Sequence, residues 1–249
     1  MLVNITYNNI DYTADLLSAI DISIPIQSEG LVAWDMPEAV ISPVSIGDWV
    51  GDISKGASIN FNNITFNPHA HATHTECVGH ISKQKESLNK ELSVFFFLAK
   101  VITVMPKQHN QDCVITKNLL KKELERDKEI DAVVIRTLPN TKSKLKKNYS
   151  NTNPPYLLKN AAEYLASLDV KHLLIDLPSV DKEKDEGNLN AHKAFWGYPN
   201  NIRPGCTITE LIYVPSSIMD GCYLLNLQFA PFENDASPSR PLLFELQKR

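Results

Sequence analysis

The sequence lacks several features that mark specialised classes of protein. Its 249 residues include four cysteines, which form neither a Cys-x-x-Cys pair nor a dense framework, so we expect reduced thiols. The longest apolar run, Val94–Ala99, is far shorter than the ~20 residues of a membrane span. The N-terminus has no basic start followed by an apolar core, which argues against a secretory signal. A formal net charge of −4 offers no basic surface for nucleic acid. We therefore expect a cytoplasmic protein that binds neither membranes nor nucleic acid.

The first hundred residues are rich in β-forming patterns. Apolar and polar residues alternate in Asp21–Gln27, and β-formers surround an Asn-Asn turn candidate in Ser58–Phe66. Ser93–Val104 is continuously apolar with many β-branched and aromatic residues, which is typical of a strand buried on both faces. Short β-like runs return between Thr207 and Leu246.

Strand and helix patterns alternate in the middle of the chain. They predict an amphipathic helix, a strand, a helix capped by Asn160 and a second strand, at Asn118–Ile130, Asp131–Pro139, Asn160–Val170 and Lys171–Ser179. This alternation indicates an α/β unit with parallel strands. The basic loop Lys142–Pro155 is interpreted as solvated surface. Because no long linker interrupts the chain, residues 1–249 are predicted to form one α/β domain with a large β component.

Histidines concentrate in one short window. Of seven in the chain, four (His69, His71, His74 and His80) fall within twelve residues, together with Glu76. Random placement would put roughly a third of one histidine there. Imidazole and carboxylate form the ligand set of Zn²⁺ and similar ions, so the window predicts a metal or acid–base site.

The spacing of these residues constrains how they can meet. In an extended segment His74 and Glu76 leave the same face, whereas His69 and His74, five apart, leave opposite faces. For both histidines to reach one ion, the chain must bulge or loop between Ala70 and Thr73. Gly79 permits a turn that returns His80 over the site.

The window resembles the hallmark His-x-Gly-Thr-His-x-Asp-x-Pro-x-His of the metal-dependent cyclase-like hydrolases, a family that includes bacterial kynurenine formamidase. Thr73–Glu76 matches Thr-His-x-Asp, and His80 falls at the last histidine. Further blocks that resemble the family follow in order at Ile175–Asp181, Asn190–His192, Thr209–Leu211 and Asp235–Arg240, after an opening strand at Asp21–Ile26. The resemblance covers most of Asp21–Leu246.

The resemblance implies the swivelling β/β/α fold of the cyclase-like proteins, with a mixed-sheet core and flanking helices. It also implies one or two bound Zn²⁺ ions, with Mn²⁺ or Fe²⁺ as alternatives, and a homodimer or homotetramer. The implied metal ligands are His69, His74, Glu76, His192 and Glu210, with Glu76 as the bridging carboxylate. His71 is the alternative to His69 as first ligand, and His80 is the implied catalytic proton shuttle.

The sequence departs from the family motif at several positions. Ala70 occupies the register of the first histidine, Glu76 replaces aspartate, and Ala72 and Val78 replace glycine and proline. These changes suggest a divergent branch, and they bear on the substrate more than on the metal.

Other residues have weaker expectations attached to them. Trp34 and Phe66, with Phe195 and Trp196, are candidates to line a pocket for an aromatic substrate, although aromatic residues more often fill cores. Cys77 is interpreted as a core thiol. Asp176 and Asp181 flank a Pro-Ser turn. The resemblance implies that Asp181 shapes the metal site, and the alternative is a carboxylate that caps the turn. Three further residues are expected to stabilise the fold or an oligomer contact: Asp235, Ser237 and Arg240. His109 and His172 lie outside the matching motifs, and we expect no functional role for them.

The resemblance implies hydrolysis of a small-molecule carbon–nitrogen amide bond by metal-activated water. The activity it most suggests is that of an arylformamidase, which converts N-formylkynurenine to kynurenine and formate. The alternatives are hydrolysis of another small amide, cyclic imide or lactone, and metal binding without catalysis.

Overall fold

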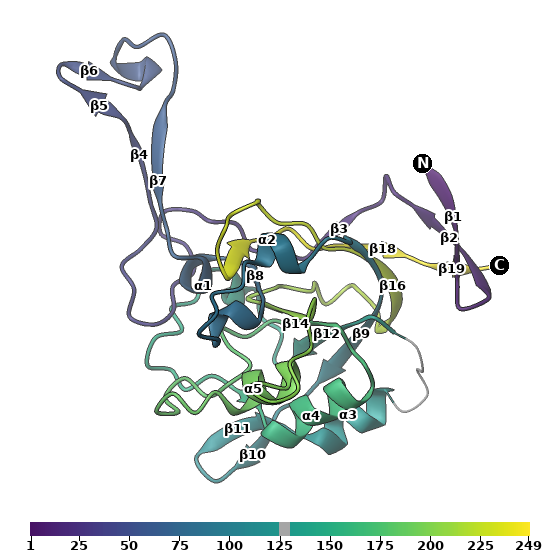
Figure 1. The fold of residues 1–249 in the computed structure, drawn as a ribbon. Helices are drawn as coiled ribbons and strands as arrows, with labels where there is room; N and C mark the ends of the chain where they lie inside the picture. Colours follow the sequence, from purple (N-terminus) through teal and green to yellow (C-terminus); the bar gives the residue numbers. More distant parts are fainter. Residues whose placement is uncertain (125–129) are drawn as a thin grey trace.

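The centre of the protein is a nine-stranded mixed sheet, seen in a computed structural model that describes residues 1–124 and 130–249 (Figure 1). In spatial order its strands are β17 (Ala236–Pro238), β8 (His74–Glu76), β15 (Thr207–Glu210), β14 (His172–Ile175), β12 (Ala132–Thr137), β9 (Phe96–Val104), β16 (Gly221–Asn226), β18 (Leu242–Glu245) and β3 (Ile20–Asp21). The four strands β15, β14, β12 and β9 are parallel, and the outer strands are antiparallel to their neighbours.

Cover on both faces of the sheet explains why the parallel strands β9, β12 and β14 are mainly apolar. The helices α3 (Lys117–Leu124), α4 (Lys159–Ser167) and α5 (Asn190–Trp196) contribute buried side chains to one hydrophobic core with β9, β12 and β14. A second core on the opposite face includes Ile22, Leu88 and Leu225. Since both faces are covered, all six residues of β12 are buried. The predicted α/β class with a β-rich mixed sheet is confirmed.

Smaller elements surround this sheet. The chain ends meet in a three-stranded sheet of β1 (Leu2–Tyr7), β2 (Ile10–Asp15) and β19 (Gln247–Lys248). A second small sheet contains β10 (Lys107–His109), β11 (Asp112–Ile115) and β13 (Tyr156–Leu157). The short helices are α1 (Pro68–His71), α2 (Leu88–Glu91), and the 3₁₀ turns η2 (Val78–His80) and η3 (Lys142–Lys146). None of the helices within the described ranges has the length and hydropathy of a membrane span.

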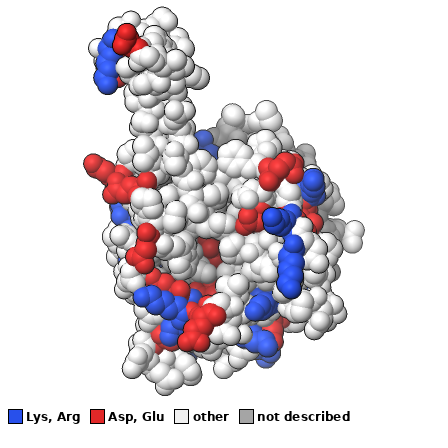
Figure 2. Space-filling view, turned by 60° about the vertical axis from the view of Figure 1, so that its left-hand side comes forward, with Lys and Arg blue, Asp and Glu red and all other residues white. Residues whose placement is uncertain are grey.

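A two-stranded arm projects from the body of the protein (Figure 1). It consists of β4 (Val40–Pro43), β5 (Ser45–Ile46), β6 (Trp49–Val50), the 3₁₀ turn η1 (Ile53–Lys55) and β7 (Asn62–Thr65). Its charged side chains, Asp48, Asp52 and Lys55, sit at the far end, so the stem is uncharged (Figure 2).

Two of the predicted β elements differ in the structure. The expected Asn-Asn turn in Ser58–Phe66 is wrong, because Asn62 and Asn63 lie inside β7 and pair with Pro43 and Ser42. In Asp21–Gln27 only Asp21 pairs in the sheet. The buried Ile22 and Ile24 nevertheless follow the predicted alternation, because this segment crosses the core as extended chain.

The two predicted helices differ from the observed ones at their ends. The helix predicted at Asn118–Ile130 is α3, Lys117–Leu124; residues 125–129 lie outside the described ranges, and Ile130 is not helical. Asn160 is not a cap, because α4 begins one residue earlier after an N-cap at Leu158 and ends at Ser167.

The basic loop Lys142–Pro155 is not simply solvated surface. Lys144 is buried, and its Nζ donates to Asp176 Oδ2 at 2.7 Å and to the Thr137 carbonyl at 2.7 Å. Tyr149 is buried as well. The sequence does not predict this contact, because nothing in the lysine-rich loop distinguishes Lys144 from the neighbouring lysines. The predicted turn at Asp176 is therefore tied to the loop by an ion pair.

Candidate metal centre

Strand pairing brings the predicted carboxylates and histidines together at one end of the sheet. In the antiparallel pair of β8 and β15, Glu210 lies opposite His74. On the other side of β8, Ala236 of β17 lies opposite Glu76, so Asp235 arrives next to the same strand. Because His74 and Glu76 are two residues apart on β8, both side chains leave one face, as expected. His74 Nε2 is 3.5 Å from Glu210 Oε2.

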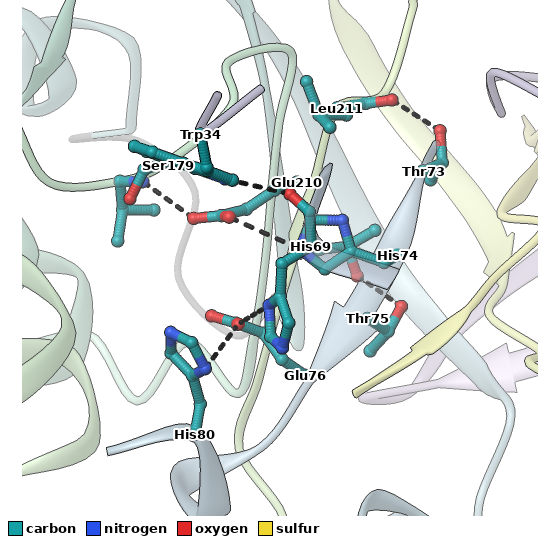
Figure 3. Close-up of polar contacts among 12 residues, drawn as sticks. Trp34, His69, Thr73, His74, Thr75, Glu76, His80, Ser179, Glu210 and Leu211 are labelled. Atoms are coloured by element: carbon teal, nitrogen blue, oxygen red, sulfur yellow. Dashed lines mark hydrogen bonds and ion pairs between the residues drawn. The ribbon is translucent and has the colours of Figure 1, made fainter. Parts of the chain in front are cut away.

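His69 joins this group because the chain forms one helical turn before β8. The turn α1 starts with Pro68 after an Asn67 cap, whose Oδ1 accepts the His69 N–H at 2.9 Å. Ala72 is then extended, and the change of direction puts His69 Nδ1 3.2 Å from Glu76 Oε2 (Figure 3). The expected departure from a straight strand is thus a helical turn.

His71 lies on the other side of that turn, away from the cluster. Its Nδ1 accepts the Asn67 N–H at 2.8 Å, and its Nε2 is 2.8 Å from the Pro37 carbonyl oxygen. Both ring nitrogens are therefore engaged elsewhere, and the structure does not bring His71 to the candidate ligands as an alternative to His69.

His192 enters the cluster from the first turn of α5. Asp181 accepts the backbone N–H groups of Ala191 and His192 at 2.6 and 3.0 Å. The same carboxylate lies 2.7 Å from His192 Nδ1, which leaves Nε2 directed at Glu76 Oε1, 3.0 Å away. Asp181 therefore both caps a helix and fixes the orientation of a cluster histidine, as carboxylates commonly do behind metal-bound imidazoles.

Two buried atoms of the cluster lack a well-formed hydrogen bond: His74 Nε2, whose contact is Glu210 Oε2 at 3.5 Å, and Glu76 Oε2, whose contact is His69 Nδ1 at 3.2 Å. His74 Nδ1 is 3.1 Å from the Ala72 carbonyl oxygen, so the proton belongs on Nδ1 and the Nε2 lone pair faces the carboxylates. Unsatisfied buried polar atoms are costly, and here both are of the kinds that coordinate divalent ions. The residues present fit a bound metal ion.

The electrostatics of the cluster also favour a cation. Burial alone lowers the pKa of His69, but hydrogen bonds to Asp235 and Glu76 outweigh it and raise the pKa to about 10. Burial also opposes ionisation of Glu76, yet the neighbouring histidines His80, His192 and His69 hold its pKa well below the usual range. The carboxylates thus stabilise positive charge in a buried site, and a bound divalent ion would supply that charge.

Within residues 1–124 and 130–249, three groups of side chains could hold an ion, with ligand atoms within 4.8 Å of one another. They are His69, His74 and Glu76; Glu76, His80 and His192; and His69, His80 and Asp235. Glu76 belongs to two of these groups, which is the geometry of a carboxylate between two ions. Glu210 lies beside both, with Oε1 3.8 Å from His192 Nε2 and Oε2 near His74.

His80 is the outermost ring of the cluster. The turn η2 places it there, with 30% of its side chain exposed and Nδ1 3.8 Å from Glu76 Oε2. Gly79 allows this turn through close approach, because a Cβ at Gly79 would lie 2.0 Å from the Glu86 carbonyl oxygen.

Asp235 is the site residue that the sequence did not indicate. It was expected to brace the fold, yet its Oδ2 lies 3.0 Å from His69 Nε2 and 3.3 Å from His80 Nδ1. Its position beside a conspicuous histidine window depends on the pairing of β17 with β8, which links residues more than 150 positions apart. Ser237 and Arg240 do brace the fold, through the Ala230 carbonyl and Asp21 respectively.

A cavity of about 300 Å³ opens over the cluster. Its lining includes Trp34, His69, His80, His192 and Glu210. Trp34 adopts a left-handed backbone conformation, φ 62°, and its indole N–H donates to the His69 carbonyl at 3.0 Å. A bulky residue rarely adopts this conformation, and such strain concentrates at functional sites.

The other aromatic candidates do not line this cavity. Phe66 stacks on Phe232 with ring centroids 6.2 Å apart, and Phe195 and Trp196 are fully buried in the core. Trp196 packs behind His192 at 5.3 Å between ring centroids. Cys77 is buried, and burial raises the pKa of its thiol to about 12, consistent with a core thiol.

Comparisons with known proteins show the family of the chain. Residues 20–182 match the model of the Cyclase family, described as "Putative cyclase". Kynurenine formamidase of Bacillus thuringiensis (strain Al Hakam) is 27% identical over 226 residues, which cover 90% of this chain and 96% of the relative.

Two solved structures share the fold. A protein described as a "Potential Metal-Dependent Hydrolase With Cyclase Activity" superposes with a TM-score of 0.66 at 18% identity, covering 92% of this chain and 98% of its own. An isatin hydrolase bound to the product analogue thioisatinate superposes with a TM-score of 0.65 at 17% identity, with coverages of 92% and 93%.

Proposed function

The chain belongs to the Cyclase family of hydrolases, and from this premise we propose that it hydrolyses a small-molecule carbon–nitrogen amide bond with the help of a metal ion. The observation that carries the proposal is the buried group of His69, His74, Glu76 and His192 below a cavity of about 300 Å³, with two ligand-type atoms that lack a well-formed hydrogen bond. The substrate we propose is an aryl formamide such as N-formylkynurenine, on the strength of the similarity to kynurenine formamidase.

The metal we propose is Zn²⁺, with Mn²⁺ as the alternative. Nitrogen and carboxylate ligands suit Zn²⁺, and one ion would be held by His69, His74 and Glu76. A second ion would be held by His192 and Glu210, with Glu76 shared between the two. Asp181 and the Ala72 carbonyl keep the imidazoles of His192 and His74 in the tautomer that a metal requires.

The chain's own residues supply the remaining chemistry. When bound, a divalent ion lowers the pKa of a coordinated water from about 16 to about 7 and polarises the scissile carbonyl. The leaving amine needs a proton, and His80, at the mouth of the site, is the residue we assign to deliver it. Asp235 contacts His80 Nδ1 and thereby directs its Nε2 away from Asp235 for proton transfer. Trp34 covers the cavity beside His69 and excludes water from one wall.

As a second substrate class we propose another small amide, a cyclic imide or a lactone, because isatin hydrolase, which shares the fold, is named for a cyclic amide. Such rings also expose a planar carbonyl to an activated water, and a cavity of about 300 Å³ is at the lower limit of small-molecule sites. The same catalytic groups would act on both substrate classes, so the residues that line the cavity would determine which class binds.

The test combines metal analysis with hydrolysis assays. The purified protein is analysed for metal, then assayed with aryl formamides, cyclic imides and lactones before and after treatment with a chelator. We expect bound zinc or manganese and hydrolysis of an aryl formamide that stops when the metal is removed and returns when it is restored. Glu76→Gln should abolish both metal and activity, whereas Asp185→Asn, in the same cavity wall, should keep the metal.

Two results would contradict the proposal. Activity that survives complete metal removal would rule out metal-dependent hydrolysis for both substrate classes. Metal without hydrolysis of any aryl formamide would overturn the arylformamidase assignment, and the cyclic imide and lactone assays would then separate the second substrate class from a metal-binding protein without catalysis.

A further inference from the structure

Lys144 and Asp176 form a buried ion pair that the proposed chemistry does not use. Lys144 Nζ donates to Asp176 Oδ2 and to the Thr137 carbonyl, both at 2.7 Å, and to Thr137 Oγ1 at 3.0 Å. Asp176 also accepts the backbone N–H of Thr137 at 2.9 Å. Burial raises the pKa of Asp176, and the charge of Lys144 opposes that effect. A buried ion pair is often no more stabilising than apolar residues of the same volume, so stability alone does not explain this one.

On one side the ion pair holds the segment that orients two proposed metal ligands. Residues 176–181, which we call the ligand turn, directly follow β14 and begin with the paired carboxylate. The Val180 N–H donates to Glu210 Oε1 at 2.8 Å. Asp181, the last residue of the ligand turn, lies 2.7 Å from His192 Nδ1. The ligand turn therefore fixes the side chains of Glu210 and His192 together.

On the other side the ion pair anchors the basic loop, which runs beside the segment that contains Trp34. The Tyr149 N–H donates to the Val32 carbonyl at 2.8 Å, and the Asp35 N–H donates to Ser150 Oγ at 2.9 Å. Trp34 and Asp35 both have left-handed backbone conformations, with φ of 62° and 52°. Such conformations persist only where the surrounding structure holds them. The basic loop supplies part of that support.

The basic loop also holds a second residue of the cavity lining. Glu183 accepts the backbone N–H groups of Asn151 and Asn153, the second at 2.8 Å. Glu183 and Trp34 both line the cavity over the histidine cluster. Trp34 packs against a small apolar core that includes Tyr149. The basic loop thus contacts two parts of the cavity lining, while its buried lysine contacts the ligand turn.

We propose that Lys144 is a positioning residue that fixes the ligand turn and the basic loop relative to each other, and with them the metal ligands and the cavity lining. This inference rests on the proposed function. Without the ammonium group the turn and the loop move more independently, so the arrangement that binds metal and substrate becomes a smaller fraction of the population. The apparent dissociation constants then rise by the inverse of that fraction, whereas saturating ligand restores the arrangement. The acceptors of the Lys144 ammonium are Asp176 and Thr137 rather than a metal ligand, so kcat at saturation should change little.

The test removes the ammonium group and compares the variant with a matched control. Lys144→Met keeps an apolar stem and loses the charge. Arg136→Met is the control, because Arg136 is 7% exposed against 9% for Lys144 and pairs with Asp220 at 2.9 Å. Arg136 also donates to the carbonyls of Pro215 and Ile218 at 2.8 Å, and these partners lie outside the ligand turn and the basic loop. Both variants therefore lose a buried ion pair, but only Lys144→Met loses the link between the turn and the loop.

Competition with an indicator gives the zinc dissociation constant, and KM and kcat for an aryl formamide are measured at saturating zinc. For Lys144→Met we expect the zinc dissociation constant to rise at least about 10-fold and KM at least about 5-fold, with kcat within about 3-fold of wild type. For Arg136→Met we expect a lower Tm, but zinc affinity and KM within about 3-fold of wild type. Asp176→Asn weakens the same pair from the ligand turn and should shift zinc affinity and KM in the same direction. It takes the place of Lys144→Met if circular dichroism shows that this variant does not fold.

Wild-type zinc affinity in a folded Lys144→Met variant, or in Asp176→Asn, would overturn the proposal. An equal loss of affinity in Arg136→Met would also overturn it, because the effect would then follow stability. An unchanged KM would overturn the link to the cavity lining. If no aryl formamide is hydrolysed, the proposed function fails, and the zinc dissociation constants alone decide the role of Lys144. A wild type that binds no zinc would overturn both.

Discussion

Replacing Asp181 with asparagine should weaken metal binding without unfolding the protein. Asp181 contacts His192 Nδ1 at 2.7 Å, and His192 Nε2 points at Glu76. Burial disfavours the Asp181 carboxylate, but contact with His192 lowers its pKa, so the charge is present at neutral pH. An asparagine keeps the shape and loses that charge, and its amide can present NH₂ to the ring.

The magnitude follows from the role of this contact. Removing the partner of a metal-bound histidine typically costs 10–100-fold in metal affinity, or about 1.4–2.7 kcal/mol. Asp181 also accepts two backbone N–H groups of α5, so some loss of stability accompanies the change. A control must therefore lose similar backbone contacts while leaving the histidines alone.

Asp185→Asn is that control. Asp185 accepts the N–H groups of Gly187 and Leu189 at 2.9 and 2.6 Å and lines the same cavity. Competition with a zinc-binding indicator gives the dissociation constant of each variant. We expect a 10–100-fold rise for Asp181→Asn and less than about 3-fold for Asp185→Asn. Equal affinities for Asp181→Asn and wild type would refute the role assigned to His192.

Three further predictions concern other parts of the protein. His80→Ala should lower kcat for an aryl formamide by roughly 100-fold or more while metal content stays unchanged; loss of metal would make His80 a ligand instead of the proton donor. Burial holds the pKa of His172 near 3, so the folded state stays neutral while the unfolded state binds a proton below pH 6.5. Stability therefore falls as the pH drops from 6.5 towards 3, by about 2 kcal/mol at pH 5, and urea unfolding of His172→Gln should lack this dependence. Gly79→Ala forces a Cβ against the Glu86 carbonyl and should lower Tm by roughly 5 °C or more, whereas Gly221→Ala, with its nearest contact at 3.9 Å, should change Tm little.

Local patterns carried most of the fold prediction. The apolar stretches that became β9, β12 and β14 were recognisable because strands covered on both faces need continuous apolar residues. Helix ends were less predictable, since α4 begins at Lys159 without a side-chain cap. The sequence predicted β structure in Ser58–Phe66 but not that this segment projects as an arm, because exposed β-formers have the same sequence pattern as buried ones.

The candidate site was predictable where its residues are close in sequence. His74 and Glu76 share a face through strand alternation alone, and the other proposed ligands His192 and Glu210 came from a resemblance. Asp235 was missed because one carboxylate far along the chain carries no local signal, and only the pairing of β17 with β8 brings it to His69. Lys144 was misjudged for the same reason, since its buried partner Asp176 belongs to another segment.

The central claim is that the histidine–carboxylate cluster binds a metal ion. Anomalous scattering from crystals grown with zinc, recorded on both sides of the zinc absorption edge, tests it most directly. We expect one anomalous peak within about 2.3 Å of His74 Nε2 and of a Glu76 carboxylate oxygen. If two ions bind, a second peak lies beside His192 Nε2. No anomalous peak among these side chains in crystals that contain zinc would contradict it.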